Sequence, residues 1–510
     1  MTISKHTCGA FILSLGLLVG CGEKFLEETP TDQITDANFY KTENDAVQAV
    51  TAAYSELNKE GQYNLALWAM DIMADVSTTG GGGGSDGIEY TQLDDYNIPT
   101  TNTVTNRLWG GSFIGLQRAN LVLQKVPAIT AIDPAIKKRC LGEAQFLRAK
   151  YYFDLVRAYG DVPLFTAPPA NPAAVNIART PAADVYRQIE TDLEAAFGNL
   201  PASYSGADLG RATKWAAAGL LAKVYLADNK KPQAVQWALE VTKNSGKTLW
   251  ANYGDNFKIE NENGRESLFE VQYVSGRNGY ERNNVGFCGN EFFAPRGSGT
   301  TPAGGGYGFN VPEPDFVNGY EAGDTRKAAT IWVPGDAYPT GSAVPAQLPQ
   351  APGSPFGFNC KKWFIGKVNT NIWDSGLNIP VLRLADVYLI LAEAAGPTGG
   401  PDGGLEAINK VRRRAFGLPV NTPSPRDLTA STPNFTDAVL RERLYELAFE
   451  FDRWFDLKRT GQLIPRMTQQ SAFLRTLGVQ RGVPTARNLV LPIPQSELDA
   501  NPGLRQNPGY

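Results

Sequence analysis

Apolar residues three and four positions apart recur along most of this chain and predict a mainly α-helical protein. The clearest helix is expected from Pro134 to Tyr159, where charged side chains mostly fall between the apolar ones. Proline suits the first turn of a helix and glycine the position after its end, so Pro134 and Gly160 mark the two ends. Comparable amphipathic segments lie at about 44–57, 113–126, 181–198, 211–228, 232–244, 382–395, 404–415 and 436–458.

These segments come in neighbouring pairs, which predicts helical hairpins stacked like tetratricopeptide repeats. Small residues within them would let neighbouring helices approach closely; they include Ala144, Ala149, Gly219 and Ala222. The expected architecture is therefore a stack of helical hairpins that acts as a rigid scaffold.

Residues 245–380 have a different composition, rich in glycine, proline, asparagine and aromatic residues. Six prolines fall between Val333 and Pro355, which no helix interior would tolerate. The alternating run from Ser267 to Tyr273 predicts a strand, and most of the remaining segment is expected to be ordered loop on the helical scaffold. Loops supported in this way commonly carry binding residues.

A run rich in glycine extends from Gly80 to Gly87. It lacks the Gly-Lys-Ser/Thr ending of a phosphate-binding loop. We therefore expect a flexible surface loop there rather than a nucleotide site.

The composition argues against several classes of function. The 510 residues carry 48 basic and 52 acidic side chains, a formal net charge of −4, and no basic stripe that would follow a phosphate backbone, so nucleic acid is not an expected partner. The single histidine, His6, lies in a segment that we expect to be removed. The mature chain would then lack the imidazole on which Ser-His-Asp and Cys-His nucleophiles and the common catalytic zinc sites depend. No metal site and no cofactor are predicted; calcium could bind among loop carboxylates, but no EF-hand-like spacing indicates it.

Residues 1–20 have the pattern of a lipoprotein signal peptide. Lys5 precedes the apolar stretch Phe11–Val19, which is too short for a permanent membrane span. The sequence Leu18-Val19-Gly20-Cys21 looks like a bacterial lipobox, whose cysteine is acylated and becomes the new N-terminus. We expect Cys21 to be the lipidation site that anchors the mature chain to a membrane; the alternative is an ordinary signal peptide with an incidental cysteine.

The mature chain keeps three further cysteines, Cys140, Cys288 and Cys360, without a CxxC pair or metal-ligand spacing. No disulfide framework is therefore expected. At most one bridge could form in an oxidising compartment, and the sequence favours no pair.

Several short motifs occur in an order that points to a known family. They are the lipobox followed by Phe25-Leu26-Glu27; Leu147-Arg148-Ala149 leading to Tyr159-Gly160-Asp161-Val162-Pro163-Leu164; Gly210-Arg211-Ala212-Thr213; Leu382-Arg383-Leu384-Ala385-Asp386-Val387-Tyr388 with Ala392-Glu393-Ala394; Glu442-Arg443-Leu444-Tyr445-Glu446-Leu447 with Arg453-Trp454-Phe455-Asp456-Leu457-Lys458-Arg459; and the tail from Leu491 to Tyr510. On these motifs, which span nearly the whole chain, the protein resembles the SusD/RagB family of outer-membrane lipoproteins from polysaccharide-uptake systems of Bacteroidetes.

The resemblance implies a non-enzymatic, SusD-like protein in which four tetratricopeptide-like hairpins support an irregular, loop-rich half with a few short strands. It implies one domain over residues 21–510, with the helical scaffold mainly in 35–245 and 380–460 and the ligand-binding part mainly in 70–108 and 245–380. By the same resemblance the protein would lie at the cell surface on the outer membrane and bind an oligosaccharide. It would act there as a lid over a SusC-like TonB-dependent transporter that receives the glycan.

Carbohydrate sites commonly combine aromatic faces, which stack on sugar rings, with amide and carboxylate groups that bind hydroxyls. Loop segments supply the candidate glycan-binding residues, which are Asp75, Tyr90, Tyr96, Asn97, Tyr280, Phe292 and Trp332. In proteins similar to this chain, the segment before the helix with Arg118-Ala119-Asn120 contributes an aromatic that stacks on the sugar and an acidic or amide partner. By position, Tyr96 corresponds to that aromatic and Asp75 to that partner. Phe293 and Trp373 belong to the same second loop segment, and each of its aromatics could instead be a core residue under a long loop.

Other conspicuous side chains are expected to hold the fold. Three tryptophans fall on helical faces and are expected to pack there: Trp215, Trp237 and Trp454. Three glutamates recur at four-residue spacing beside arginines on the same predicted helix; they are Glu442, Glu446 and Glu450, with Arg441, Arg443 and Arg453 as partners.

Two other functions stay open from the residues alone. Glycoside hydrolysis needs only two suitably spaced carboxylates, and nothing in the sequence favours a particular pair. A peptide-binding lipoprotein of the same family would use the same architecture.

Overall fold

The structure is a computed structural model that describes residues 39–83, 85–276, 285–301, 304–338, 346–347, 356–367 and 371–510. The proposed signal peptide, the lipidation site Cys21 and the candidate Tyr280 lie outside these residues. The expectations for them therefore stay predictions.

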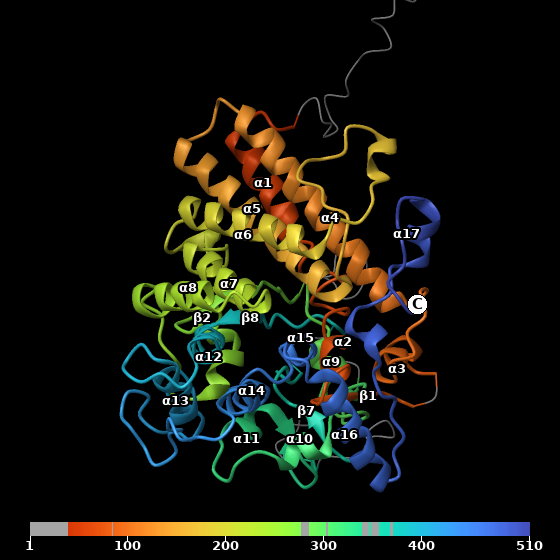
Figure 1. Ribbon diagram of the computed structural model, residues 1–510, viewed down its shortest axis with the longest axis vertical. Helices are drawn as coiled ribbons and strands as arrows, with labels where there is room; N and C mark the ends of the chain where they lie inside the picture. The colour runs from red at the N-terminus through yellow and green to blue at the C-terminus, as the bar shows by residue number, and fades with distance from the viewer. Residues whose placement is uncertain are drawn as a thin grey trace, which may run out of the picture.

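The first half of the chain forms a stack of helices in which each packs against the next (Figure 1). Its members are α1 (Glu43–Tyr54), α4 (Thr103–Lys125), α5 (Pro134–Tyr159), α6 (Ala182–Asn199), α7 (Lys214–Ala227) and α8 (Lys231–Asn244). The bounds of α5 are those predicted, because Asp133 caps it by accepting hydrogen bonds from the Ala135 and Ile136 amides and Gly160 follows its last residue. The predicted hairpin stack is confirmed in this half.

The second half extends the same stack. The helices are α12 (Leu384–Ala395), which packs against α8, and then α13 (Gly404–Ala415), α14 (Phe435–Glu446), α15 (Arg453–Arg459), α16 (Leu463–Thr476) and α17 (Gln495–Ala500). The sequence predicts one helix over 436–458, whereas the structure has two. Phe449 and Phe451, between α14 and α15, have φ angles of 62° and 67° and fully buried rings. The chain therefore breaks the helix to turn both rings into the core.

One predicted small residue explains how strands approach the stack. Strand β2 (Ser267–Val271) pairs antiparallel with β8 (Ile379–Arg383). A Cβ atom at Gly219 of α7 would lie 2.7 Å from Leu382 Cδ2 and 3.1 Å from Leu268 Cδ1. Glycine at this position thus lets the β2–β8 pair pack directly on α7.

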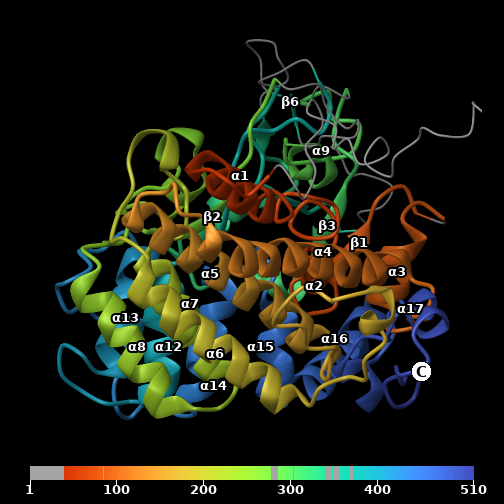
Figure 2. The ribbon, with the colours of Figure 1, turned by 90° about the horizontal axis from the view of Figure 1, so that it is seen from above.

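The irregular half contains short helices and two-stranded sheets. The helices are α2 (Ala69–Ile72), α3 (Ile88–Asp94), α9 (Gly289–Phe292), α10 (Pro314–Asn318) and α11 (Arg326–Thr330). The remaining antiparallel pairs join β1 (Ser77–Gly80) to β3 (Phe309–Pro312), β4 (Ile331–Trp332) to β7 (Asn359–Cys360), and β5 (Ala337–Tyr338) to β6 (Ala346–Gln347). Figure 2 shows α9 and β6 on one side of the molecule and helices α5 to α8 on the other. The protein is thus mainly α, with few short strands, as the sequence and the resemblance predict.

The glycine run is packed at its start rather than free. Gly80 ends β1, and the Gly81 amide donates to the Gly308 carbonyl at 2.7 Å. Gly81 has a φ of 74°, and a Cβ atom there would lie 2.6 Å from the Phe309 ring. The expectation of a flexible loop is wrong for these residues, because the absence of side chains lets the backbone lie against Phe309.

The tryptophans named above and the cysteines belong to the packed interior. Trp215 and Trp454 are buried, and Trp237 packs against the same core, as predicted. In the described part of the chain the cysteines Cys140, Cys288 and Cys360 are buried and form no disulfide.

No helix in the described ranges has the length and apolar character needed to cross a bilayer.

The glutamates at four-residue spacing do hold the fold, but their partners come from other elements. Glu446 accepts hydrogen bonds from Arg383 at the end of β8, from Arg414 of α13 and from Arg326 of α11. The predicted partner Arg443 binds Asp386 instead. Tertiary contacts rather than neighbours on one helix therefore decide the pairing.

Candidate ligand-binding site

The two residues predicted by position, Tyr96 and Asp75, lie in the core. Tyr96 is 2% exposed, and its hydroxyl donates to the Met73 carbonyl at 2.7 Å. Asp75 is fully buried between Arg453 at 2.7 Å and Arg466 at 2.8 Å. Burial opposes ionisation of Asp75, but the two arginines outweigh it and hold its pKa well below the usual range. Both predictions are corrected, since neither side chain has a surface to offer a ligand.

Two further candidates are also buried. The Tyr90 ring stacks on Trp68 with centroids 4.1 Å apart, and its hydroxyl donates to the Leu65 carbonyl. Trp332 is 4% exposed and packs against Phe364. These positions correct the expectation that Tyr90 and Trp332 stack on a sugar.

Asn97 is exposed and follows a residue that is bound to the C-terminal segment. The carbonyl of its neighbour Tyr96 accepts a hydrogen bond from Asn488 in the C-terminal segment. No contact in the described residues joins the Asn97 side chain to the other candidates.

Phe292 is the predicted aromatic that reaches the surface among the described candidates. It is half-buried and lies 5.5 Å from Tyr307 and 5.6 Å from Trp373, measured between ring centroids. Tyr307 and Trp373 are also half-buried, and their rings are 6.2 Å apart. We call Phe292, Tyr307 and Trp373 the aromatic cluster.

A second, buried layer of rings supports the aromatic cluster. Phe309 at the start of β3 stacks under Phe292 with an interplanar angle of 27°. Phe309 in turn contacts Tyr90 and Trp68 of the core. The half-exposed rings are therefore held on a rigid base rather than on a loose loop.

Polar groups lie beside the aromatic cluster. Arg296 Nη1 donates to Asp86 Oδ2 and to the Tyr307 carbonyl, both at 3.0 Å, and the Asp86 and Arg296 side chains are 42% and 34% exposed. The Gly82 amide also donates to Asp86 at 2.7 Å. An aromatic surface with a fixed carboxylate and guanidinium at its edge can stack on a ring and bind its hydroxyl groups.

A buried glutamate of α9 lies next to the rings. The Glu291 backbone carbonyl accepts from the Tyr307 amide at 2.7 Å, and its side chain is 1% exposed. Burial raises the pKa of Glu291 to about 7. Glu291 thus belongs to the support of the cluster, because its carboxyl group is covered.

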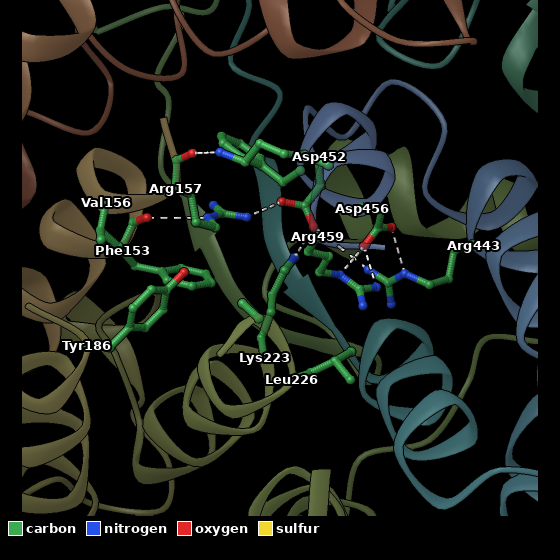
Figure 3. A pocket seen from close by; sticks show the side chains of 13 residues that line it. Phe153, Val156, Arg157, Tyr186, Lys223, Leu226, Arg443, Asp452, Asp456 and Arg459 are labelled. Carbon is green, nitrogen blue, oxygen red and sulfur yellow. Dashed lines mark hydrogen bonds and ion pairs between the residues drawn. The ribbon is translucent and has the colours of Figure 1, made fainter. Parts of the chain in front are cut away.

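A separate cavity inside the scaffold is a poor candidate for the ligand. Figure 3 shows this cavity, of about 180 Å³, between α5, α6, α7 and α15. Four of its basic side chains pair with carboxylates, Arg157 and Lys223 with Asp452 and Arg443 and Arg459 with Asp456, and Lys458 donates to the Arg157 carbonyl. Ligand pockets usually have about 300–1,000 Å³. The cavity is therefore a small space within a salt-bridge network.

Within the described ranges, no group of three or more His, Cys, Asp or Glu residues is arranged to hold a metal ion. The prediction of no cofactor is not tested by this observation. The described site consists of aromatic, amide, carboxylate and guanidinium groups.

Sequence reasoning named Phe292 and Trp373 but missed Tyr307, Arg296 and Asp86 as parts of the site. Tyr307 stands between Gly306 and Gly308, so an aromatic flanked by glycines was the available signal. Arg296 and Asp86 are 210 positions apart in the sequence. No local pattern could have brought that pair together.

Comparisons with known proteins agree with this fold. A family model described as the SusD family matches residues 265–510, and one described as starch-binding associating with outer membrane matches residues 24–226. A SusD-like protein of Bacteroides ovatus is 31% identical over 483 residues, covering 88% of this chain and 81% of that protein. A SusD-like protein of Formosa agariphila is 28% identical over 541 residues, covering 96% of each chain.

Solved structures give the same result. A structure described as a laminarin-binding SusD-like protein is 30% identical, with a TM-score of 0.78 over 92% of this chain and 100% of that chain. A SusD homologue from Bacteroides thetaiotaomicron, 24% identical, has a TM-score of 0.78 over 94% of this chain and 99% of that chain, which supports the fold alone. The protein therefore belongs to the SusD family.

Proposed function

We propose that this protein is a cell-surface lipoprotein that binds an oligosaccharide without cleaving it and passes it to a SusC-like TonB-dependent transporter in the outer membrane. The observation that carries the proposal is the aromatic cluster, three half-buried rings on a rigid base beside Asp86 and Arg296. The relative described as laminarin-binding supports a glycan ligand and makes laminarin the first one to test.

The chemistry of the cluster suits an uncharged sugar. Its rings are held by contacts with one another and with Phe309, so binding costs little additional side-chain entropy. Asp86 and Arg296 neutralise each other and still expose part of their hydrogen-bonding atoms. Such a pair favours hydroxyl groups over a ligand with a strong net charge.

The positions of the nearby acids support retention without cleavage. Hydrolysis of a glycosidic bond needs two carboxyl groups, about 5–10 Å apart, that both reach the scissile bond. Glu291 and Asp374 are each 1% exposed, and Asp86 is bound to Arg296. Incubation with laminarin should therefore release no reducing ends; multiple turnovers would favour the glycoside hydrolase instead.

The membrane anchor and the transporter are supported by the lipobox-like segment at Cys21 and by the outer-membrane association in the matched family description. Replacing Cys21 by Ala in the native organism should move the protein out of the membrane fraction. Cross-linking in intact cells should capture a TonB-dependent transporter. A protein that stays in the membrane without Cys21, or a cross-link to no transporter, would contradict this part of the proposal.

The binding test compares Trp373→Ala with a matched control. Trp237 is also a half-buried tryptophan, but it packs on Phe197 in the helical scaffold. In calorimetric titration with laminarin oligosaccharides, Trp373→Ala should weaken binding tenfold or more, about 1.4 kcal/mol. Trp237→Ala should lower the melting temperature without changing affinity. Unchanged affinity in a folded Trp373→Ala protein would contradict the site, and saturable binding of peptides but no glycan would favour a peptide ligand.

A further inference from the structure

A groove lies on the side of the molecule away from the aromatic cluster. It has a volume of about 600 Å³ and is lined by residues of α14, α15 and α16 and by Asp315 and Gly319. Figure 2 shows these three helices on the side opposite α9. The volume falls within the range of about 300–1,000 Å³ that is usual for ligand pockets.

The floor of this groove is fixed by buried ion pairs and hydrogen bonds. Arg453 and Arg466 both bind the fully buried Asp75, at 2.7 and 2.8 Å. The buried Gln470 donates to Glu313 and, at 3.3 Å, to Asp315. A floor held in this way is organised before any ligand arrives, which lowers the cost of binding.

The rim offers polar groups that are not used by the fold. Steps of three and four place Gln462, the N-cap of α16, and Gln469 and Phe473 of α16 on the face that lines the groove, beside Arg466 and Gln470 of the floor. Across the described part of the chain, the side chains of Gln462, Gln469 and Asp437 form no hydrogen bond or ion pair, and all three are exposed. These amide and carboxylate groups are free to bind a ligand.

Charge and aromatic content define the ligand class. Counted together with the covered Asp75 beneath its floor, the groove has three carboxylates and three guanidinium groups, which are Asp75, Asp315, Asp437, Arg441, Arg453 and Arg466. The groove thus has no net charge. Tyr445 of α14 and Phe473 of α16 add one aromatic ring from each helix, and Phe473 is 37% exposed.

From this combination we infer that the groove is a second carbohydrate-binding site, which takes a short uncharged oligosaccharide segment between α14 and α16. Hydroxyl groups would bind the free amides and Asp437, and a sugar face would lie against Phe473. The inference does not depend on the aromatic cluster, because the two sites share no lining residue. A protein with both sites could hold one long glycan chain at two points and gain avidity.

The test separates the two sites by substitution. Binding is measured by ligand-observed saturation-transfer NMR and by calorimetry, first with laminarihexaose and then with a panel of neutral oligosaccharides. The variants are Trp373→Ala, a groove variant that carries both Gln469→Ala and Phe473→Ala, and a triple variant that carries all three substitutions. Arg475→Ala is the control, because Arg475 is exposed on α16 but does not line the groove. The substituted groove residues are exposed, so folding should be unaffected.

We expect two binding components in the parent protein. The groove variant should lose one of them, by tenfold or more in affinity, and keep the component that Trp373→Ala removes; Arg475→Ala should keep both. Binding that no groove substitution changes, for every glycan in the panel, would overturn the second site while leaving the first intact. Binding lost in the groove variant but retained in Trp373→Ala would support the groove and contradict the aromatic cluster. A groove that binds peptides and no sugar would also overturn the inference.

Discussion

Arg383 binds both the side chain and the backbone of Glu446. Its Nη1 donates to Glu446 Oε1 at 2.9 Å, and its Nη2 donates to the Glu446 carbonyl at 3.0 Å. Arg383 ends β8 and Glu446 ends α14, so the pair joins the β2–β8 strands to the C-terminal helices. Both side chains are almost completely buried.

Replacing Arg383 by Met should destabilise the protein by about 3–5 kcal/mol, because buried carboxylates lose a partner that compensates their desolvation. The affected groups include Glu446, Glu266 and Glu450. Urea unfolding followed by circular dichroism measures the change. Arg187→Met is the control, since its pair with Asp184 is exposed and should contribute less than about 1 kcal/mol. Equal effects of the two substitutions would contradict the structural role of Arg383.

Glu446 should make stability depend on acidic pH. Burial opposes its ionisation, but Arg414, Arg383 and Arg326 outweigh burial and lower its pKa from 4.5 to about 2. A depressed pKa in the folded state contributes stability above pH 4.5 that is lost as the pH falls towards 2. The free energy of unfolding, measured from pH 6 to pH 3, should therefore fall less steeply in Glu446→Gln than in the parent protein. Parallel pH profiles would show that Glu446 does not titrate in this way.

Gly81→Ala should weaken both stability and glycan binding. A left-handed backbone costs a residue with a Cβ atom about 1–2 kcal/mol. At Gly81 the new atom would also displace Phe309, which supports Phe292. Gly83→Ala is a matched control, because Gly83 has a φ of 76° but no atom within 4 Å of the added Cβ. Thermal unfolding and calorimetry should show the backbone cost in both variants and loss of affinity only in Gly81→Ala.

Lys458 should destabilise the folded state near neutral pH. Burial and the charge of Arg157 lower its pKa from 10.5 to about 7. Between pH 7 and 10.5 the unfolded chain then binds more protons than the folded one, so stability rises with pH over this window. Lys458→Met should be more stable than the parent protein at pH 6, and the difference should shrink towards pH 10. If Lys458→Met exceeds the parent protein in free energy of unfolding by the same amount at pH 6 and pH 10, the lowered pKa of Lys458 would be contradicted.

The cysteines should react only after unfolding. Cys140, Cys288 and Cys360 are buried, and burial raises the pKa of each thiol. A thiol reagent should therefore label them slowly in buffer and rapidly in denaturant, and a reducing agent should leave the melting temperature unchanged. A drop in melting temperature on reduction would indicate a disulfide.

The predictions that succeeded rest on local chemistry. The ends of α5 follow from Pro134, Gly160 and the cap at Asp133, all of which act within one turn of the helix. The assignment of Tyr96 and Asp75 to the ligand failed because a polar loop composition does not show how deeply a loop is covered. Residues from distant parts of the chain meet both positions, since Arg453 pairs with Asp75 and Asn488 donates to the Tyr96 carbonyl.

Local patterns along the chain were enough to predict the helical scaffold, the contrast between scaffold and irregular half, and the family resemblance, because periodicity, caps and ordered motifs are properties of neighbouring residues. Which aromatic rings reach the surface and which charges meet became known from the packing of the folded chain. Phe292, Tyr307 and Trp373 come together, and Asp86 meets Arg296, through the packing of segments that are far apart in the chain. Burial and long-range ion pairing depend on that packing, and no local pattern encodes it.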